Sequence, residues 1–242
     1  MDEAKRKQFI SRLSRALGRE QALCPAYVEG FDYSKGPQET MFKDLSHEQV
    51  IEMFKAECDK NGTKYVNTTP DKLGETLLAA IADWGNGKVV FPNTQEVEEY
   101  KLKELFAKDA ETNNGTRTYF QWDASLGRDV CISNTANADI GVTFPYCGIA
   151  ETATVVQASG VESGRAISLL PDTHIAIVYT DSIRPRMTQT MEHLQERYDS
   201  DPSAFPSNIC LISGPSRTAD IELVRVDGAH GPIQCTYILV DR

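Results

Sequence analysis

Residues 211–232 read LISGPSRTADIELVRVDGAHGP. The first two letters belong to an apolar run, residues 209–212, which predicts a short buried strand. Gly214 and Pro215 end that strand, because glycine and proline interrupt local structure. The rest of the stretch carries hydroxyl, carboxylate, guanidinium and imidazole groups. We therefore expect a strand followed by a loop in which binding or catalytic groups are concentrated.

This loop offers several groups that can bind a ligand, namely Ser213, Ser216, Arg217, Thr218, Asp220, Glu222 and His230. The spacing predicts that Ser216 or Thr218 caps a short helical turn. In an open α/β sheet, ligands bind at the carboxyl ends of the strands, where we expect this loop to lie. The alternative is that the polar residues make only turns and caps, with Arg217 and Asp220 as an ion pair. The spacing alone leaves both interpretations open.

Strands and helices alternate along the rest of the chain. Strands are predicted over residues 64–67, 88–91, 116–122, 139–144, 151–157, 174–179 and 233–241. Helices are predicted from Ser46 to Asn61, from Pro70 to Trp84, over residues 95–106 and 133–138, and from Met187 to Tyr198. Such alternation is typical of an α/β fold, a three-layer, mostly parallel sheet covered on both faces.

The amino-terminal segment, residues 1–45, is predicted to stand apart from an α/β domain over residues 46–242. Residues 2–17 predict an amphipathic helix with a basic face, and Gly18 ends it. Residues 21–45 lack periodicity and predict an extended linker. The helix is either an arm that docks on an acidic partner or another copy, or a helix that packs on its own domain. We favour the second interpretation.

Charge and cysteine content narrow the class of protein. The net charge of −10 repels phosphate backbones, so we expect no nucleic acid partner. No apolar run approaches the ~20 residues that span a bilayer, and no secretory signal is evident. The six cysteines form no C-x-x-C pair, so we expect reduced cysteines, no metal site and a cytoplasmic protein. The chain contains no G-x-G-x-x-G and no Walker loop, and we predict no cofactor.

Three blocks of sequence resemble one known family. They are ISGPSRTADIE with GAHGP (residues 212–222 and 228–232), GIAETATVV (148–156) and GRAISLLPDTHIAIV (164–178). They occur in the order of the lactate utilization protein C family (LUD domain), and the resemblance covers roughly residues 60–242. Where that family often has glycine after AET, this chain has Ala153, which disfavours a backbone with positive φ.

The resemblance implies both a fold and a role. The fold is similar to the group that contains ribose-5-phosphate isomerase, glucosamine-phosphate deaminase and CoA-transferase. The role is in the oxidation of L-lactate to pyruvate, together with partner proteins that carry iron–sulfur clusters. The first hypothesis is thus a non-redox subunit of an L-lactate utilization assembly that binds a small carboxylate. The second is a stand-alone enzyme on this scaffold, acting on a phosphorylated or acyl substrate. The third is a structural or regulatory assembly factor.

Glu151 is the first candidate for chemistry, and His230 is the second. A carboxylate beside Thr152, between two predicted strands, can serve as a general base or a nucleophile. Its alternative role is a helix cap or an ion pair with Arg165 or Arg217. His230 lies in a tight glycine-rich loop and can exchange a proton near neutral pH.

Arg165 and Arg217 are the candidates for binding a carboxylate, because a guanidinium matches it with two parallel hydrogen bonds. Each could equally pair with a nearby aspartate, Asp172 or Asp220. The hydroxyls of Thr152, Ser213, Ser216 and Thr218 suit an anion as well. His174 begins a strand and is expected to be structural. We predict that the three blocks fold into one cleft.

Overall fold

The computed structural model describes residues 3–18, 36–37, 40–220 and 222–242. Its contacts divide the chain into two units, residues 1–41 and 42–242. Helix α1 (Glu3–Ala16) belongs to the first unit and matches the predicted helix, with Gly18 at φ +69° after its end. Most of the predicted linker over residues 21–45 lies outside the described residues. Leu45, near the start of the second unit, packs against that unit's core.

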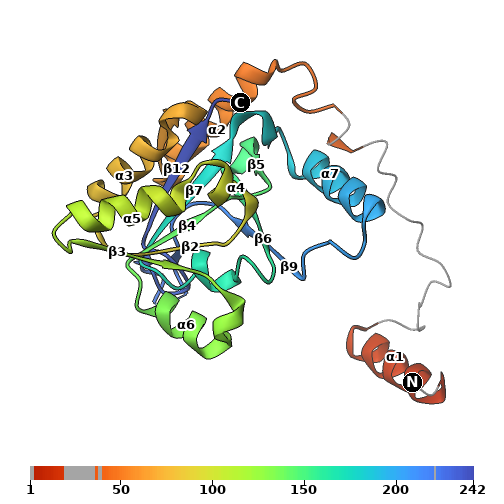
Figure 1. The fold of residues 1–242 in the computed structure, drawn as a ribbon. Coiled ribbons are helices and arrows are strands. Elements are labelled where there is room, and N and C mark those ends of the chain that lie inside the picture. Colours follow the sequence, from red (N-terminus) through yellow and green to blue (C-terminus); the bar gives the residue numbers. More distant parts are fainter. Residues whose placement is uncertain (1–2, 19–35, 38–39, 221) are drawn as a thin grey trace. The chain divides into compact units, whose positions relative to one another are not determined.

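The second unit is built on a six-stranded parallel sheet (Figure 1). Its strands are β1 (Lys64–Thr68), β2 (Gly87–Phe91), β3 (Arg117–Gln121), β4 (Ile140–Thr143), β7 (Thr173–Tyr179) and β12 (Gln234–Val240). They lie in the order β1-β12-β7-β4-β2-β3, and every neighbouring pair is parallel. The predicted α/β class is therefore confirmed.

One face of this sheet is covered by helices (Figure 1). They are α3 (Leu73–Asp83), which follows a 3-10 turn at Pro70–Lys72, α4 (Gln95–Glu99) and α5 (Leu102–Thr112). Alternate strand residues point to opposite faces, so in β7 Ile175 and Ile177 meet these helices while Ala176 and Val178 point to the other side. This period of two positions divides the apolar residues between two cores.

The opposite face is covered by a helix and a second, smaller sheet. Helix α2 (His47–Asn61) begins with the predicted capping box at Ser46 and ends at Gly62, whose φ of +76° suits glycine. The small sheet contains β5 (Cys147–Ile149), β6 (Thr154–Ser159), β8 (Ile183–Arg184) and β9 (Asn208–Ile212), in the order β8-β5-β6-β9. Val155 of β6 shares a buried cluster with Phe54 of α2 and Tyr237 of β12.

Two further helices complete this side. Helix α7 (Met187–Ser200) packs Leu194 on the outer face of the small sheet, so that this sheet lies between α7 and the parallel sheet. Helix α6 (Arg128–Ala136) is longer than the predicted segment 133–138 and packs Cys131 near Val90 of β2.

Three local predictions were wrong. The helix predicted over residues 95–106 is divided into α4 and α5, because Lys101 adopts a left-handed conformation (φ +50°) that interrupts it. The strand predicted over residues 151–157 begins only at Thr154, after a 3-10 turn at Ala150–Thr152. No helical turn follows Ser216: β10 (Arg217–Thr218) pairs with β11 (Val226–Asp227), and strand pairing satisfies the backbone groups.

Candidate functional site

Glu151 lies in the 3-10 turn at Ala150–Thr152, and both oxygens of its carboxylate have partners. Oε2 accepts a hydrogen bond from Arg186 Nε at 2.8 Å, and Oε1 accepts one from the backbone N–H of Met187 at 3.3 Å. Met187 is the first residue of α7, where a negative charge is favourable. The side chain of Glu151 is 21% exposed. These contacts fasten the turn to the start of α7.

Arg186 was not among the residues singled out from the sequence. Arg165 and Arg217 were the predicted partners of Glu151, but the ion pair is formed with Arg186. The two residues come together because β5 and β8 are parallel neighbours and both lead into this corner. The available signal was local, since an arginine directly before a helix that begins at Met187 is well placed to meet the preceding loop.

A chain of hydroxyl groups joins two of the three sequence blocks. Thr152 Oγ1 lies 2.7 Å from Thr154 Oγ1, which lies 2.6 Å from Ser213 Oγ. Thr154 is buried, while Thr152 and Ser213, at the two ends of this row of hydroxyl groups, are exposed. Because the two internal bonds use two of the three hydroxyl protons, this chain of hydroxyls can present one donor to an anion, at either of its ends. Thr152 and Ser213 were predicted site residues, whereas Thr154, which connects them, was not.

The Tyr237 hydroxyl joins the two segments that carry Thr154 and Ser213. Its hydroxyl lies 3.1 Å from the carbonyl oxygens of both Ala153 and Ile212, to either of which it can donate, and it accepts from the N–H of Gly214 at 3.0 Å. The ring is fully buried, and burial raises the pKa of Tyr237 well above its usual value, so the hydroxyl stays protonated. A tyrosine within the aliphatic strand QCTYILV could have indicated this role from the sequence, because a buried hydroxyl needs hydrogen-bond partners.

Ala153 adopts positive φ (+47°) at the position where the resemblance led us to expect glycine. Its methyl group is fully buried in the cluster that contains Phe54 and Tyr237. The left-handed backbone turns the chain from the Glu151 turn into β6, which places the Ala153 carbonyl on the Tyr237 hydroxyl.

Arg217 binds backbone and carboxylate groups within the fold. Its guanidinium lies against Gly62 and donates to the Asn61 carbonyl, and its Nε lies 3.7 Å from Oδ1 of Asp227. Asp227 also accepts from Arg225 at 2.8 Å. Arg217 therefore fastens the β10–β11 pair to the end of α2, and its carboxylate partner is Asp227 rather than Asp220.

The other polar residues of this loop hold its shape. Ser216 Oγ accepts from the N–H of His230 at 3.3 Å, and the Ser216 N–H donates to the Pro232 carbonyl at 2.8 Å. Thr218 Oγ1 accepts from the N–H of Asp220 at 3.2 Å. The side chain of His230 is exposed. The loop lies beside Asn61–Thr63, just before β1, and it leads into β12. It is therefore at the amino edge of the parallel sheet and not at the expected carboxyl edge.

Arg165 lies apart from these groups. It is exposed in a 3-10 turn at Arg165–Ser168, directly after Gly164, which packs on Trp122 at the end of β3. Strands β3 and β1 are the opposite edges of the parallel sheet, so Arg165 and Arg217 cannot share a small ligand. Across the described residues, no hydrogen bond or ion pair joins Glu151 to Arg165, Arg217 or His230. The structure thus brings Thr152 and Ser213 together, near the Arg217 loop, and separates Arg165 from them.

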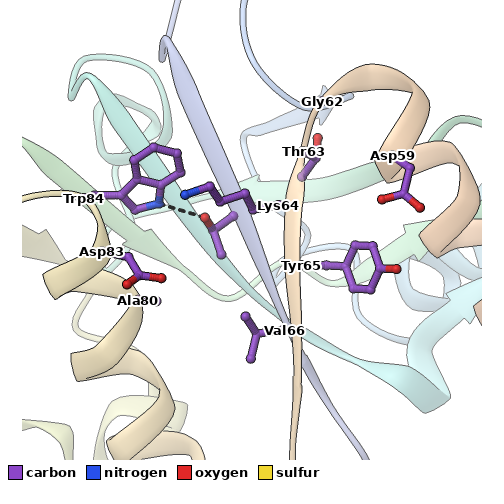
Figure 2. A pocket seen from close by; sticks show the side chains of 10 residues that line it. Asp59, Gly62, Thr63, Lys64, Tyr65, Val66, Ala80, Asp83 and Trp84 are labelled. Atoms are coloured by element: carbon purple, nitrogen blue, oxygen red, sulfur yellow. Dashed lines mark hydrogen bonds between the residues drawn. The ribbon is translucent and has the colours of Figure 1, made fainter.

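A pocket of about 540 Å³ lies beside this loop, at the amino ends of β1 and β12. Figure 2 shows Lys64 next to Trp84, with Asp83 and Asp59 on opposite sides of the hollow. The Lys64 ammonium lies 3.8 Å from the centre of the Trp84 ring, and Trp84 Nε1 donates to Thr236 Oγ1 at 2.8 Å (Figure 2). This pocket was not predicted from the sequence, because its walls come from α2, α3 and two strands that are far apart in the chain.

Burial holds His174 and Cys58 neutral. His174 is fully buried and contacts Thr143 Oγ1 through Nε2 at 2.8 Å, and burial lowers the pKa of its imidazole to about 4. Burial likewise raises the pKa of the Cys58 thiol to about 12. Within the described ranges, no three histidine, cysteine, aspartate or glutamate side chains are grouped as a metal site would require. None of the described helices has the length and apolar character to cross a bilayer.

The fold and the three sequence blocks define an α/β protein of one particular class. The model of the LUD domain matches residues 51–240, so the chain belongs to the LUD domain family. It is 36% identical to Lactate utilization protein C of Bacillus licheniformis over 233 residues, which are 96% of this chain and 95% of that protein. It is 36% identical to the protein of the same name from Bacillus subtilis over 234 residues, or 97% of this chain and 95% of that protein.

A solved structure is similar in fold. It is the crystal structure of a DUF162 family protein from Deinococcus radiodurans, with a TM-score of 0.52 and 18% identity. The match covers 81% of this chain and 99% of that one. At this level of identity the likeness concerns the arrangement of strands and helices alone.

Proposed function

We propose that this chain takes part in lactate utilization, as a non-redox subunit of a cytoplasmic assembly that oxidises L-lactate to pyruvate with iron–sulfur partner proteins. One observation carries the proposal: relatives named Lactate utilization protein C match almost the whole chain and almost the whole of their own length. In this division of labour the partners transfer the electrons, and this chain binds substrate or holds the partners together.

Within this proposal, the exposed Ser213 end of the hydroxyl chain donates its free proton to the carboxylate of the substrate. Thr152 and Ser213 are exposed and share one hydrogen-bonded chain, and hydroxyl groups are good donors to a carboxylate. Arg217, on the same loop as Ser213, adds a positive charge nearby, with a side chain that is 32% exposed.

The test is lactate oxidation by the reconstituted partner proteins, with and without this chain. We expect the rate to depend on the chain, and to fall about 10- to 100-fold with Ser213→Ala, since one hydrogen bond to a charged group contributes roughly 1.5–3 kcal/mol. Thr112→Ala is the matched control, because that hydroxyl bonds only to backbone carbonyls within α5. A rate that is the same without the chain would remove the proposal.

In this proposal Glu151 holds the turn at Ala150–Thr152 against the start of α7, since both of its oxygens already accept hydrogen bonds from Arg186 and Met187. We predict that Glu151→Gln lowers the free energy of unfolding by about 1 kcal/mol, through loss of a partly exposed ion pair. The rate with reconstituted partners should stay within about threefold of wild type. Urea unfolding and the rate assay measure these effects. A stable variant whose rate is abolished would instead indicate that Glu151 is the base or nucleophile of an enzyme.

A further inference from the structure

The parallel sheet has a point at which its connections change direction, between neighbouring strands β2 and β4. The chain leaves β2 for β3 on one side, and leaves β4 for β7 on the other. In open α/β sheets a crevice forms at such a point, outside the carboxyl ends of the strands, and ligands bind there. In this structure Thr94 follows β2, Phe144 follows β4, and both residues line a pocket of about 240 Å³.

Three buried polar atoms at this pocket have no hydrogen-bond partner among the described residues: Thr94 Oγ1, Gln157 Oε1 and Ser159 Oγ. Gln157 is 3% exposed and Ser159 is 7% exposed. Thr94 precedes α4 as its N-cap residue, yet its side chain makes no capping bond. Leaving a buried polar atom unpaired destabilises a fold, so three at one pocket indicate that something else binds them.

The chemistry of the lining determines the kind of ligand. The amide of Gln157 already donates through Nε2 to the Ala158 carbonyl, which leaves its Oε1 as an acceptor. Glu96 and Glu162 add carboxylate acceptors, and none of the described lining residues is a lysine or an arginine. The ligand must therefore supply hydrogen-bond donors, and a carboxylate or phosphate would be repelled.

The size and the walls narrow the choice further. The pocket holds the volume of roughly eight water molecules. Phe144 and Tyr146 provide aromatic walls against which carbon-bound hydrogens can pack. We propose that this pocket binds a small polyhydroxylated molecule without negative charge, whose hydroxyls donate to Gln157, Glu96 and Glu162 and exchange hydrogen bonds with Thr94 and Ser159.

This site is separate from the one assigned to lactate. The two lie at opposite ends of β6, since Thr154 begins the strand at the hydroxyl chain and Ser159 ends it at the pocket. The strand spans about 16 Å between them. The inference does not depend on the proposed function, and either can fail alone.

The test follows ribitol binding to the full chain by amide chemical shifts in NMR, with ethanolamine and L-lactate as comparison probes. Direct detection is needed because polyols also raise melting temperatures without binding. We expect ribitol to shift the amides of residues 94, 157 and 159, and to bind more tightly than the other two probes. Preference for ethanolamine or lactate, or no shift with ribitol at millimolar concentration, would overturn the proposal.

Two variants connect binding to the unpaired atoms. Ser159→Ala and Thr94→Val each remove an unpaired hydroxyl, so both should fold at least as stably as wild type and bind ribitol about fivefold more weakly. Ser168→Ala is the matched control, because the hydroxyl of Ser168 is also buried but bonds to the Arg165 carbonyl outside the pocket. It should lose stability and keep its affinity. Equal affinity in Ser159→Ala, Thr94→Val and wild type would contradict the assignment.

Discussion

The Tyr237 hydroxyl connects two loops that lie far apart in the sequence, at Ala153 and at Ile212–Gly214. We predict that Tyr237→Phe lowers the free energy of unfolding by about 2 kcal/mol, because it leaves a buried N–H and carbonyl oxygens without this partner. Urea unfolding measures the change. Tyr65→Phe is the control, since that hydroxyl has no hydrogen-bond partner within the described part of the chain and its loss should alter stability by less than about 0.5 kcal/mol.

His174 makes the fold sensitive to mild acid. Its pKa is about 4 in the folded chain, against an ordinary value of 6.5, so between these values only the unfolded chain takes up the proton. The free energy of unfolding should therefore fall as the pH drops from about 6.5 to about 4, by up to about 3 kcal/mol. Urea midpoints across this range measure the slope. His174→Gln should flatten it, whereas exposed His47→Gln should not; an equal slope in wild type and His174→Gln would contradict the prediction.

At this scale the sequence indicates which residues carry chemistry better than which residues meet. Thr152 and Ser213 could be selected by type and do share a hydrogen-bonded chain. The partner of Glu151 could not be selected, because Arg186 reaches it only through the pairing of β5 with β8. A short three-residue strand such as β5 leaves almost no periodic signal in the sequence.

Among the elements, α5 and edge strand β3 are joined by a buried ion pair. Asp109 of α5 accepts from Arg117 Nε at 2.8 Å and from the Tyr119 hydroxyl at 2.6 Å. Its side chain is 8% exposed and that of Arg117 is 16% exposed. The hydrogen bond from Arg117 is the main cause that lowers the pKa of Asp109 to about 2.

We predict that Asp109→Asn lowers the free energy of unfolding by about 3 kcal/mol, because it leaves a mostly buried guanidinium without its counter-charge. In wild type the contribution of this carboxylate is complete above about pH 4 and is lost as the pH falls towards 2, since the folded pKa lies below the unfolded one. Thermal unfolding between pH 2 and pH 5 measures the effect. Asp129→Asn, at a fully exposed position, should leave stability unchanged.

Helix boundaries were predicted well where the cap is local. The Ser46 capping box and Gly62 lie where their residue types indicate, because each forms bonds within a few residues. The break at Lys101 was not predicted, since nothing in the residue type favours φ +50° there and the packing of Leu102 and Phe106 determines it. The same limit applies to β10 and β11, which are held by partners outside their own segment.

For the whole molecule, the parallel sheet could be inferred from alternating strands and helices, while the small sheet could not. Its strands come from four separate segments, and two of them are three residues or shorter. The loop after β9 was predicted to lie at the carboxyl edge of the parallel sheet, and this was wrong for the same reason. Because β9 belongs to the small sheet, its end lies at the amino edge of the large one. The residues at the carboxyl edge can be identified only from the full strand order.

The division of the chain at residues 41 and 42 predicts that the second unit folds alone. We expect residues 42–242 to unfold in one cooperative transition, with a midpoint within about 2 °C of the full chain, because the four buried clusters lie entirely within them. Calorimetry measures this. A lower midpoint for the shortened chain would mean that residues 1–41 contribute to the stability of the core.

Strand β1 ends the parallel sheet, and its only strand partner in the described chain is β12. Lys64 and Asn67 are exposed along it, and the strand is five residues long. A short edge strand that carries a charge resists pairing with the edge strand of another molecule, and such pairing can start aggregation. We therefore expect the charge of Lys64, which rests on Trp84, to oppose edge-to-edge association of two molecules at high concentration.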